Sequence, residues 1–137
     1  MKTLNVEVIT PSSAAYQGMA KSITLPGSGG SFQVLYNHAP ILSSLDVGIV
    51  KIEEDNGEVK TFAAGGGTVE VLNNKVLLLA ESFESPEQVD VRRAEEAMNR
   101  AKKRLSKEAE EVKVDHTRAE VALKRAINRL KLSGHYK

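Results

Sequence analysis

The residues that could do chemistry are few in this chain, and they do not cluster. It has three histidines, His38, His116 and His135, and no cysteine. The histidines lie far apart, and none has an HxH or HExxH spacing, so neither a metal site nor a nucleophile–histidine–acid group is indicated. Pro40 keeps Ala39 out of helical geometry, which makes the segment around His38 a turn. We therefore expect no metal ligand and no catalytic residue, and we do not expect an enzyme.

Two glycine-rich segments could suggest ligand loops. "PGSGGS" (26–31) lacks the Gly-Lys-Ser/Thr end of a phosphate-binding loop and the spacing of a dinucleotide-binding loop, and no helical pattern follows it. "AAGGGT" (63–68) lies within a strand pattern, where glycines indicate a bulge or a close approach of backbone. We interpret the first segment as a loop between strands and the second as a structural feature of one strand.

The arginines are the more informative residues, because all seven follow residue 86 and six of them form two copies of one pattern. Within each copy the arginines stand at i, i+7 and i+11: Arg93, Arg100 and Arg104 in the first, and Arg118, Arg125 and Arg129 in the second. One interpretation is a solvated face with i,i+4 pairs, each worth a few tenths of a kcal/mol. The other is a site for a polyanion or an acidic protein surface. Nucleic acid is not expected, since Tyr136 is the only aromatic residue in this part of the chain.

Charge divides the chain in two. Residues 1–86 hold five lysines and nine acidic residues (−4), whereas residues 87–137 hold fourteen basic and nine acidic residues (+5). Such an asymmetry predicts two structures with different partners. A hydrophobic content of 41% is enough for a core, and no apolar run approaches the roughly 18 to 20 residues of a membrane span. With no signal-peptide pattern and no cysteine, we expect a reducing, cytoplasmic-side location.

The first part has the pattern of strands. "LNVEVIT" alternates with period two, "IVKIEEDNGEVKTFAA" is typical of a hairpin that turns at Asp55-Asn56-Gly57, and "TVEVLNNKVLLLAE" repeats the pattern around Asn73-Asn74. We predict an antiparallel β-sandwich over residues 1–84.

The second part has the pattern of two helices. Ser85, Pro86 and Gln88 form a helix-start signal with a capping box, and no glycine or proline follows until residue 134. "RAEEAMNRAKKRL" (93–105) is repeated 25 residues later as "RAEVALKRAINRL" (118–130), each with an alanine-rich stripe. We predict an antiparallel helical hairpin over 85–137, with a reversal near Val112 to Asp115 and Asp115 or Thr117 as cap, and hence an α+β fold. Because an alanine seam buries little area, we expect the hairpin to be movable.

Several segments together resemble the epsilon subunit of bacterial F-type ATP synthase. "LPGSGGSFQVLYNHAPILSSLDVG" resembles its glycine-rich, His-x-Pro segment, and Tyr16-Gln17-Gly18, "GGGTVEV" and "VLLLAES" follow in the expected order. "VDVRRA" and "RAEVALKRAINRL" resemble its two-helix domain. Gln33 and Asn37 stand where many relatives have glycine. The resemblance covers essentially the whole chain.

The resemblance implies a non-catalytic rotor subunit, peripheral on the cytoplasmic face of the cell membrane and not inserted into it. In this family the β-sandwich holds the gamma subunit and sits on the ring of c subunits. The hairpin folds against the sandwich or extends toward the alpha and beta subunits, where it restrains ATP hydrolysis. Ser31 and His38 would then be subunit-interface residues.

The resemblance also implies a regulatory ATP site, with no cofactor required. The candidate residues matching the family's pattern are Glu84, Val89, Asp90, Arg93, Ala94, Arg100, Arg125 and Arg129. A salt-bridged helix pair without ATP is the alternative for these residues. A free-standing nucleotide- or anion-sensing module with the same fold is the alternative for the whole chain.

Overall fold

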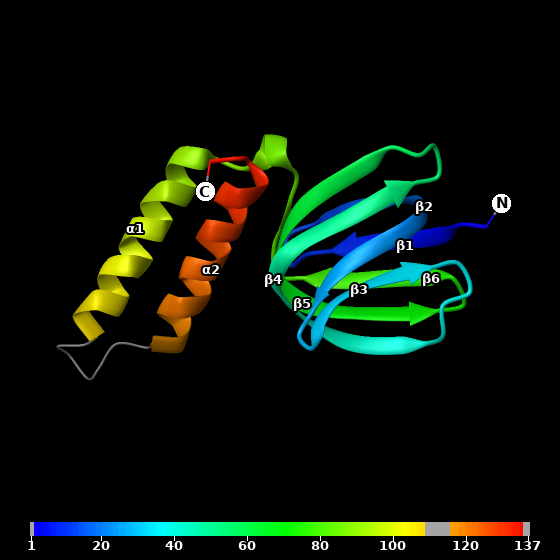
Figure 1. The fold of residues 1–137 in the computed structure, drawn as a ribbon, viewed down its shortest axis with the longest axis horizontal. Coiled ribbons are helices and arrows are strands. Elements are labelled where there is room, and N and C mark those ends of the chain that lie inside the picture. Colours follow the sequence, from blue (N-terminus) through cyan, green and yellow to red (C-terminus); the bar gives the residue numbers. More distant parts are fainter. Residues whose placement is uncertain (1, 109–115, 136–137) are drawn as a thin grey trace.

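The computed structural model describes residues 2–108 and 116–135, in which a β domain is followed by two helices (Figure 1). The strands are β1 (Leu4–Ile9), β2 (Ala14–Gly27), β3 (Gly30–Leu35), β4 (Ile41–Glu54), β5 (Val59–Leu72), β6 (Lys75–Ala80) and β7 (Phe83–Glu84). The helices are η1 (Pro86–Gln88), α1 (Val91–Glu108) and α2 (His116–Leu132). The predicted fold class, a β-sandwich followed by a helical hairpin, is confirmed.

The strands form one sheet that closes on itself into a two-layered sandwich. The hydrogen-bonded order is β1-β6-β5-β4-β2-β3, with β7 on β5, and an additional pairing between β1 and β2 closes the path. All pairs are antiparallel except β1 with β6. Strands β2, β4 and β5 have 14 residues each and change their pairing partners along their length, so each contributes to both layers.

The turns lie where the sequence predicts them. Gly57, at φ +87°, donates its N–H to Glu54 O at 2.9 Å in the β4–β5 turn. Asn73 and Asn74 both have positive φ in the β5–β6 turn, as a tight reversal requires. "PGSGGS" is the β2–β3 connection, closed by the pairing of Gly27 with Gly30. The "AAGGGT" segment is a close approach, because a Cβ atom at Gly67 (φ +149°) would collide with the carbonyl oxygen of Leu79.

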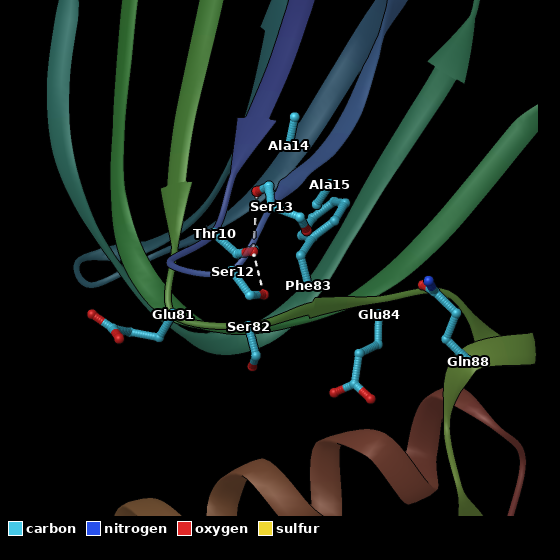
Figure 2. Close-up of a pocket in the computed structure, with 10 residues that line it drawn as sticks. All are labelled: Thr10, Ser12, Ser13, Ala14, Ala15, Glu81, Ser82, Phe83, Glu84 and Gln88. Carbon is cyan, nitrogen blue, oxygen red and sulfur yellow. Dashed lines mark hydrogen bonds between the residues drawn. The ribbon is translucent and has the colours of Figure 1, made fainter.

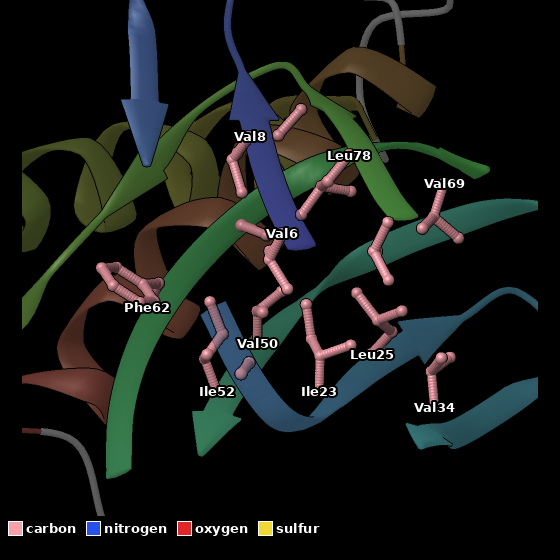
Figure 3. Packing of buried hydrophobic residues seen from close by; sticks show 14 of the residues in the cluster. Val6, Val8, Ile23, Leu25, Val34, Val50, Ile52, Phe62, Val69 and Leu78 are labelled. Atoms are coloured by element: carbon pink, nitrogen blue, oxygen red, sulfur yellow. The ribbon is translucent and has the colours of Figure 1, made fainter. Parts of the chain in front are cut away.

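The core lies between the two layers and consists of large branched side chains. Alternate residues of β1 point inward, as period two predicts. Figure 3 shows side chains from several strands packed together. The largest fully buried side chains of the sandwich core are Leu4, Ile23, Leu25, Ile52 and Leu78, each 0% exposed.

The helical part starts later than the sequence predicts. Ser85 begins only the short turn η1, in which its N–H donates to Gln88 Oε1 at 2.8 Å. Val89 is then extended, and α1 begins at Val91 after Asp90, whose Oδ1 accepts from Arg93 N–H at 3.0 Å. Serine and aspartate are similarly favoured as N-caps, and here Ser85 caps η1 while Asp90 caps α1. The predicted reversal and Asp115 lie outside the described residues, whereas Thr117 lies in the first turn of α2.

The two helices are not equivalent in the fold. Helix α2 lies against β4 and β5, and α1 packs on α2 from the outer side (Figure 1). The hairpin buries small side chains, namely Ala94, Ala101, Ala119 and Ala126, together with Leu130. Small side chains let helices approach closely, which agrees with the predicted antiparallel hairpin.

Candidate functional site

A cavity of about 360 Å³ lies where the two helices meet the end of β7. It is lined by Glu84, Gln88, Asp90, Arg93, Ala94, Ala97, Arg100 and Arg129. Three segments therefore contribute: the β7–η1 segment, the first two turns and a half of α1, and the last turn of α2.

The geometry of each segment explains why these side chains converge. Residues 93, 94, 97 and 100 recur at helical spacing, so they share one face of α1. Asp90 is held at the N-terminus of that helix by its bond to Arg93 N–H. Glu84 projects from the end of β7 toward α2, as Figure 2 shows, and there meets Arg129. The cavity thus depends on α2 lying against the sandwich.

The cavity has unneutralised positive charge. Arg129 Nε lies 2.5 Å from Glu84 Oε1, and both side chains are about a quarter exposed (29% and 26%). Within residues 2–108 and 116–135, Arg93 and Arg100 form no ion pair. The guanidinium groups of Arg93 and Arg100 suit an anion, while the Asp90 carboxylate already caps the adjacent helix N-terminus.

Six of the eight candidate ATP residues line this cavity, and two do not. Val89 is buried (9% exposed) without being part of the lining. Arg125 is directed elsewhere, with its Nε donating to Gly65 O on β5 at 3.2 Å. Gln88 and Ala97 line the cavity but were not among the candidates. Ala97 follows from helical spacing between Arg93 and Arg100, whereas Gln88 was interpreted only as a capping residue.

A second cavity of about 370 Å³ lies on the other side of β7 (Figure 2). Its lining includes Thr10, Ser12 and Ser13 of the β1–β2 turn, together with Phe83. The hydroxyl of Thr10 donates to Ser13 O at 3.2 Å and lies 3.4 Å from Ser12 Oγ. These hydroxyls therefore stabilise the turn.

The two candidate interface residues lie at opposite ends of β3. Ser31 is exposed beside the β2–β3 turn, whereas His38 follows the strand. His38 donates its backbone N–H to Leu35 O at 3.1 Å, and its Nδ1 lies 2.7 Å from Ala39 O. Asn37 next to it exchanges hydrogen bonds with Asn74, at 2.6 and 3.2 Å. His38 is thus a turn residue, as predicted.

Among the residues that the structure describes, the pair of titratable groups with shifted pKa values lies away from the first cavity. Tyr16 Oη donates to Glu54 Oε2 at 2.6 Å, and Lys60 Nζ lies 3.3 Å from Glu54 Oε1. The hydrogen bond from Tyr16 holds the pKa of Glu54 below its usual value, and burial together with that bond raises the pKa of Tyr16. The Tyr16 ring also packs edge-on against Phe62 at 5.6 Å. This cluster links β2, β4 and β5, and Tyr16, Lys60 and Phe62 line a further cavity of about 450 Å³.

Neither metal ligation nor membrane spanning is seen in the described part of the chain. Among residues 2–108 and 116–135, no three His, Cys, Asp or Glu side chains are grouped so that they could hold a metal ion. In the same residues no helix is long and apolar enough to cross a membrane.

Comparisons with known proteins agree over nearly the full length. Residues 3–86 match the family "ATP synthase, Delta/Epsilon chain, beta-sandwich domain", and residues 87–134 match "ATP synthase, Delta/Epsilon chain, long alpha-helix domain". The chain is 40% identical over 134 residues to the ATP synthase epsilon chain of Nitratidesulfovibrio vulgaris, covering 98% of each chain. It is 37% identical over 131 residues to that of Syntrophomonas wolfei, covering 96% of this chain and 94% of the relative.

The fold is also found in a solved structure. A chain of the Euglena gracilis mitochondrial ATP synthase superposes with a TM-score of 0.80 at 18% identity, covering 98% of this chain and 83% of that one. This similarity supports the fold. The family matches and the bacterial relatives show to which family the chain belongs. The resemblance seen in the sequence is confirmed: the chain belongs to the ATP synthase delta/epsilon family and is similar to its bacterial epsilon chains.

Proposed function

We propose that the chain is a non-catalytic rotor subunit in the central stalk of a proton-translocating F-type ATP synthase, on the cytoplasmic face of the membrane, and that its hairpin inhibits ATP hydrolysis. The observation that carries the regulatory part is the way in which α2 is held. Its described hydrogen bonds to the sandwich come from Arg125, Asn128 and Arg129. A contact held by the hydrogen bonds of three side chains can be broken and remade, which a movable inhibitor requires.

The gamma subunit is proposed to bind the outer face of one layer of the sandwich. Neighbouring strands β1, β6, β5 and β4 expose apolar side chains there: Ile9, Leu79, Leu72 and Leu42, which are 37–75% exposed. Ile9 pairs with Leu79 across the sheet, whereas Leu42 and Leu72 pair with the charged residues Glu70 and Lys75. An exposed apolar patch of this kind is typical of a permanent subunit contact. Ser31, at the β2–β3 turn, is the proposed contact with the c-ring.

The hairpin is proposed to inhibit hydrolysis by extending toward acidic surface on the alpha and beta subunits. Residues 87–137 have a net charge of +5, and complementary charge governs docking of this type. In a reconstituted complex, a chain ending at Glu84 should raise the hydrolysis rate. The full-length triple variant Arg118→Glu, Arg125→Glu, Arg129→Glu should raise it as well. Unchanged hydrolysis with both variants would rule out the inhibitory role.

ATP is the proposed regulatory ligand of the cavity between the helices. Asp90 can accept from the adenine amino group, Val89 and Ala94 can flank the ring, and arginines can hold the phosphates bidentately. Arg93 and Arg100 are free to do so, whereas Arg129 must be shared with Glu84 and Arg125 must leave Gly65 O. Bound ATP would favour the folded hairpin, because only that state brings both helices to the ligand.

Titration calorimetry with millimolar ATP on the full chain tests this site. Arg93→Ala should abolish the heat of binding, and Arg92→Ala is the control, because Arg92 is exposed and paired with Glu96 outside the cavity. If the wild-type chain gives no heat, or if Arg93→Ala and Arg125→Ala leave it unchanged, the ATP site is wrong. A pulldown from native membranes separates the rotor subunit from a free-standing sensor, since only the former should co-purify with gamma.

A further inference from the structure

We infer that Asn128 is the residue that positions α2 on the sandwich, and that it thereby assembles the cavity without contacting a ligand in it. Asn128 is one of two polar residues buried in the described chain, with 8% of its surface exposed. Its Nδ2 donates to Gly48 O on β4 at 2.8 Å and lies 3.5 Å from Ala64 O on β5. One side-chain amide therefore joins the helix to two strands.

The two acceptors are adjacent in the sheet. Gly48 and Ala64 are register partners in the β4–β5 ladder, so a single donor group can reach both carbonyl oxygens only from one position of the helix. A buried carbonyl that loses its donor incurs a desolvation penalty of about 1–3 kcal/mol. The contact at Asn128 consequently fixes where α2 lies along the strands, and not only that it lies there.

The helical repeat shows which feature distinguishes α2 from α1. A shift of 25 residues aligns Arg125, Ala126, Arg129 and Leu130 of α2 with identical residues of α1, namely Arg100, Ala101, Arg104 and Leu105. At the place of Asn128, α1 has Lys103, which is exposed. A lysine between the two carbonyls would bring a charge without a carboxylate partner into a buried site, which is strongly unfavourable. The arginines are common to both helices, so they cannot determine which helix packs on the sandwich. Asn128 occurs only in α2 at this repeat position, so it can.

Docking by Asn128 and completion of the cavity are linked through its neighbour in sequence. Of the α2 side chains that the structure describes, Arg129 alone lines the cavity, and it reaches Glu84 when α2 is docked. Release of α2 removes that arginine and opens one wall. The consequence for ATP rests on the proposed function, whereas the consequence for docking does not.

The docking part is tested in the full-length chain with one nitroxide label. Because the chain has no cysteine, Thr68→Cys gives a single attachment point on β5, about 10 Å along the strand from Gly65. In the wild type the label should broaden the NMR signals of α2 residues near Asn128. Asn128→Lys should reduce that broadening to less than half, while circular dichroism shows that the helices persist.

Helix α1 supplies a matched control. Asn99 on α1 is exposed, so Asn99→Lys makes the same chemical change without touching the sandwich and should leave the broadening of α2 as it is. If Asn128→Lys loses helix content, Asn128→Asp decides, because it keeps the shape of the side chain and removes both donor hydrogens. Wild-type broadening in both Asn128 variants, or an equal loss in Asn99→Lys, overturns the inference.

The cavity part is tested by calorimetry with ATP as the probe. Asn128→Lys should weaken ATP binding by about tenfold or more, since binding requires the docked state and its population falls. Asn99→Lys should bind as the wild type does. If the wild type binds no ATP, the proposed ATP site fails and the label experiment still decides the role of Asn128. Undiminished ATP binding by an Asn128→Lys chain whose α2 is released would show that Asn128 does not assemble the cavity.

Discussion

The sandwich and the hairpin each have buried side chains, but the buried side chains of the two parts differ in size. The interior of the sandwich consists mainly of leucine, isoleucine and valine from six strands, with three alanines and with Phe62 and Phe83 stacked at 4.4 Å. Among the described residues, the buried side chains of α1 and α2 are alanines, Asn128 and Leu130. Burial of a Leu or Ile side chain contributes about 1.5–3 kcal/mol, and burial of an alanine much less.

This difference in side-chain size means that the sandwich is stable by itself, whereas the hairpin is stabilised by what it packs against. The sandwich has enough buried apolar area to be a stable unit, whereas the hairpin depends on its contact with the sandwich or with a partner. Polar contacts with backbone carbonyls suit such a part, because they specify one docked position and are replaced by water when the helix leaves. Stability and mobility are thus assigned to different segments of one short chain.

The largest expected effect is the loss of a core side chain. Leu78→Ala should lower the free energy of unfolding by about 3–4 kcal/mol, because the fully buried leucine leaves a cavity between the layers. Urea denaturation measures it, and Leu79→Ala on the opposite face (48% exposed) is the control, with a change below about 1 kcal/mol. Equal losses in the two variants would contradict the description of the core.

A hairpin substitution should have a smaller and more local effect. Leu130→Ala removes the one large buried side chain of the described helices and should destabilise the hairpin by about 2–3 kcal/mol. Hydrogen exchange should quicken in α1 and α2 and remain slow in β4 and β5. Lys124→Ala, at an exposed position of the same helix, should leave both rates unchanged. Faster exchange throughout the sandwich after Leu130→Ala would mean that the two parts unfold together.

Tyr16→Phe should have an effect of about 1 kcal/mol that depends on pH. The lowered pKa of Glu54 stabilises the folded state above the pKa that this carboxyl has in the unfolded chain, and the stabilisation is lost as pH falls through the lowered value. The variant should therefore be destabilised at neutral pH and equal to the wild type in strong acid. Denaturation at several pH values checks this, and a constant difference down to pH 2 would show that packing of the ring, not Glu54, is responsible.

The smallest effect on the sandwich should come from removal of the hairpin itself. A chain ending at Glu84 should keep its β structure and should still assemble with gamma. Its free energy of unfolding should differ from that of the sandwich in the full chain by less than about 1 kcal/mol. Circular dichroism and a binding assay measure the two properties. A folded fragment that fails to bind gamma, or a fragment that does not fold, would contradict the division between the two parts.

The sequence was sufficient for features that depend on neighbours along the chain. Alternation in "LNVEVIT", the Asp55-Asn56-Gly57 turn and the alanine stripes each indicate a local structure, and each was found. Features decided by contacts between distant segments were missed. The late start of α1 is a local exception, in which Ser85 begins η1 and Asp90, five residues further on, caps α1. Arg125 matched the ATP pattern, but its direction depends on a carbonyl 60 residues away, at Gly65. The contact made by Asn128 could not be predicted, since an asparagine within a helix has no distinctive sequence pattern.

The pairing of β1 with both β2 and β6 has a consequence for how the protein is made. The first strand can complete its hydrogen bonds only after Ala80, the last residue of β6, has been synthesised. Helix α2 begins 36 residues later, at His116, which takes roughly 2 to 7 s of further synthesis at about 5–20 residues per second. The closed sheet can therefore form on the ribosome while the second helix is still being added. The surface of the sandwich on which α2 packs would therefore be complete before α2 has been synthesised.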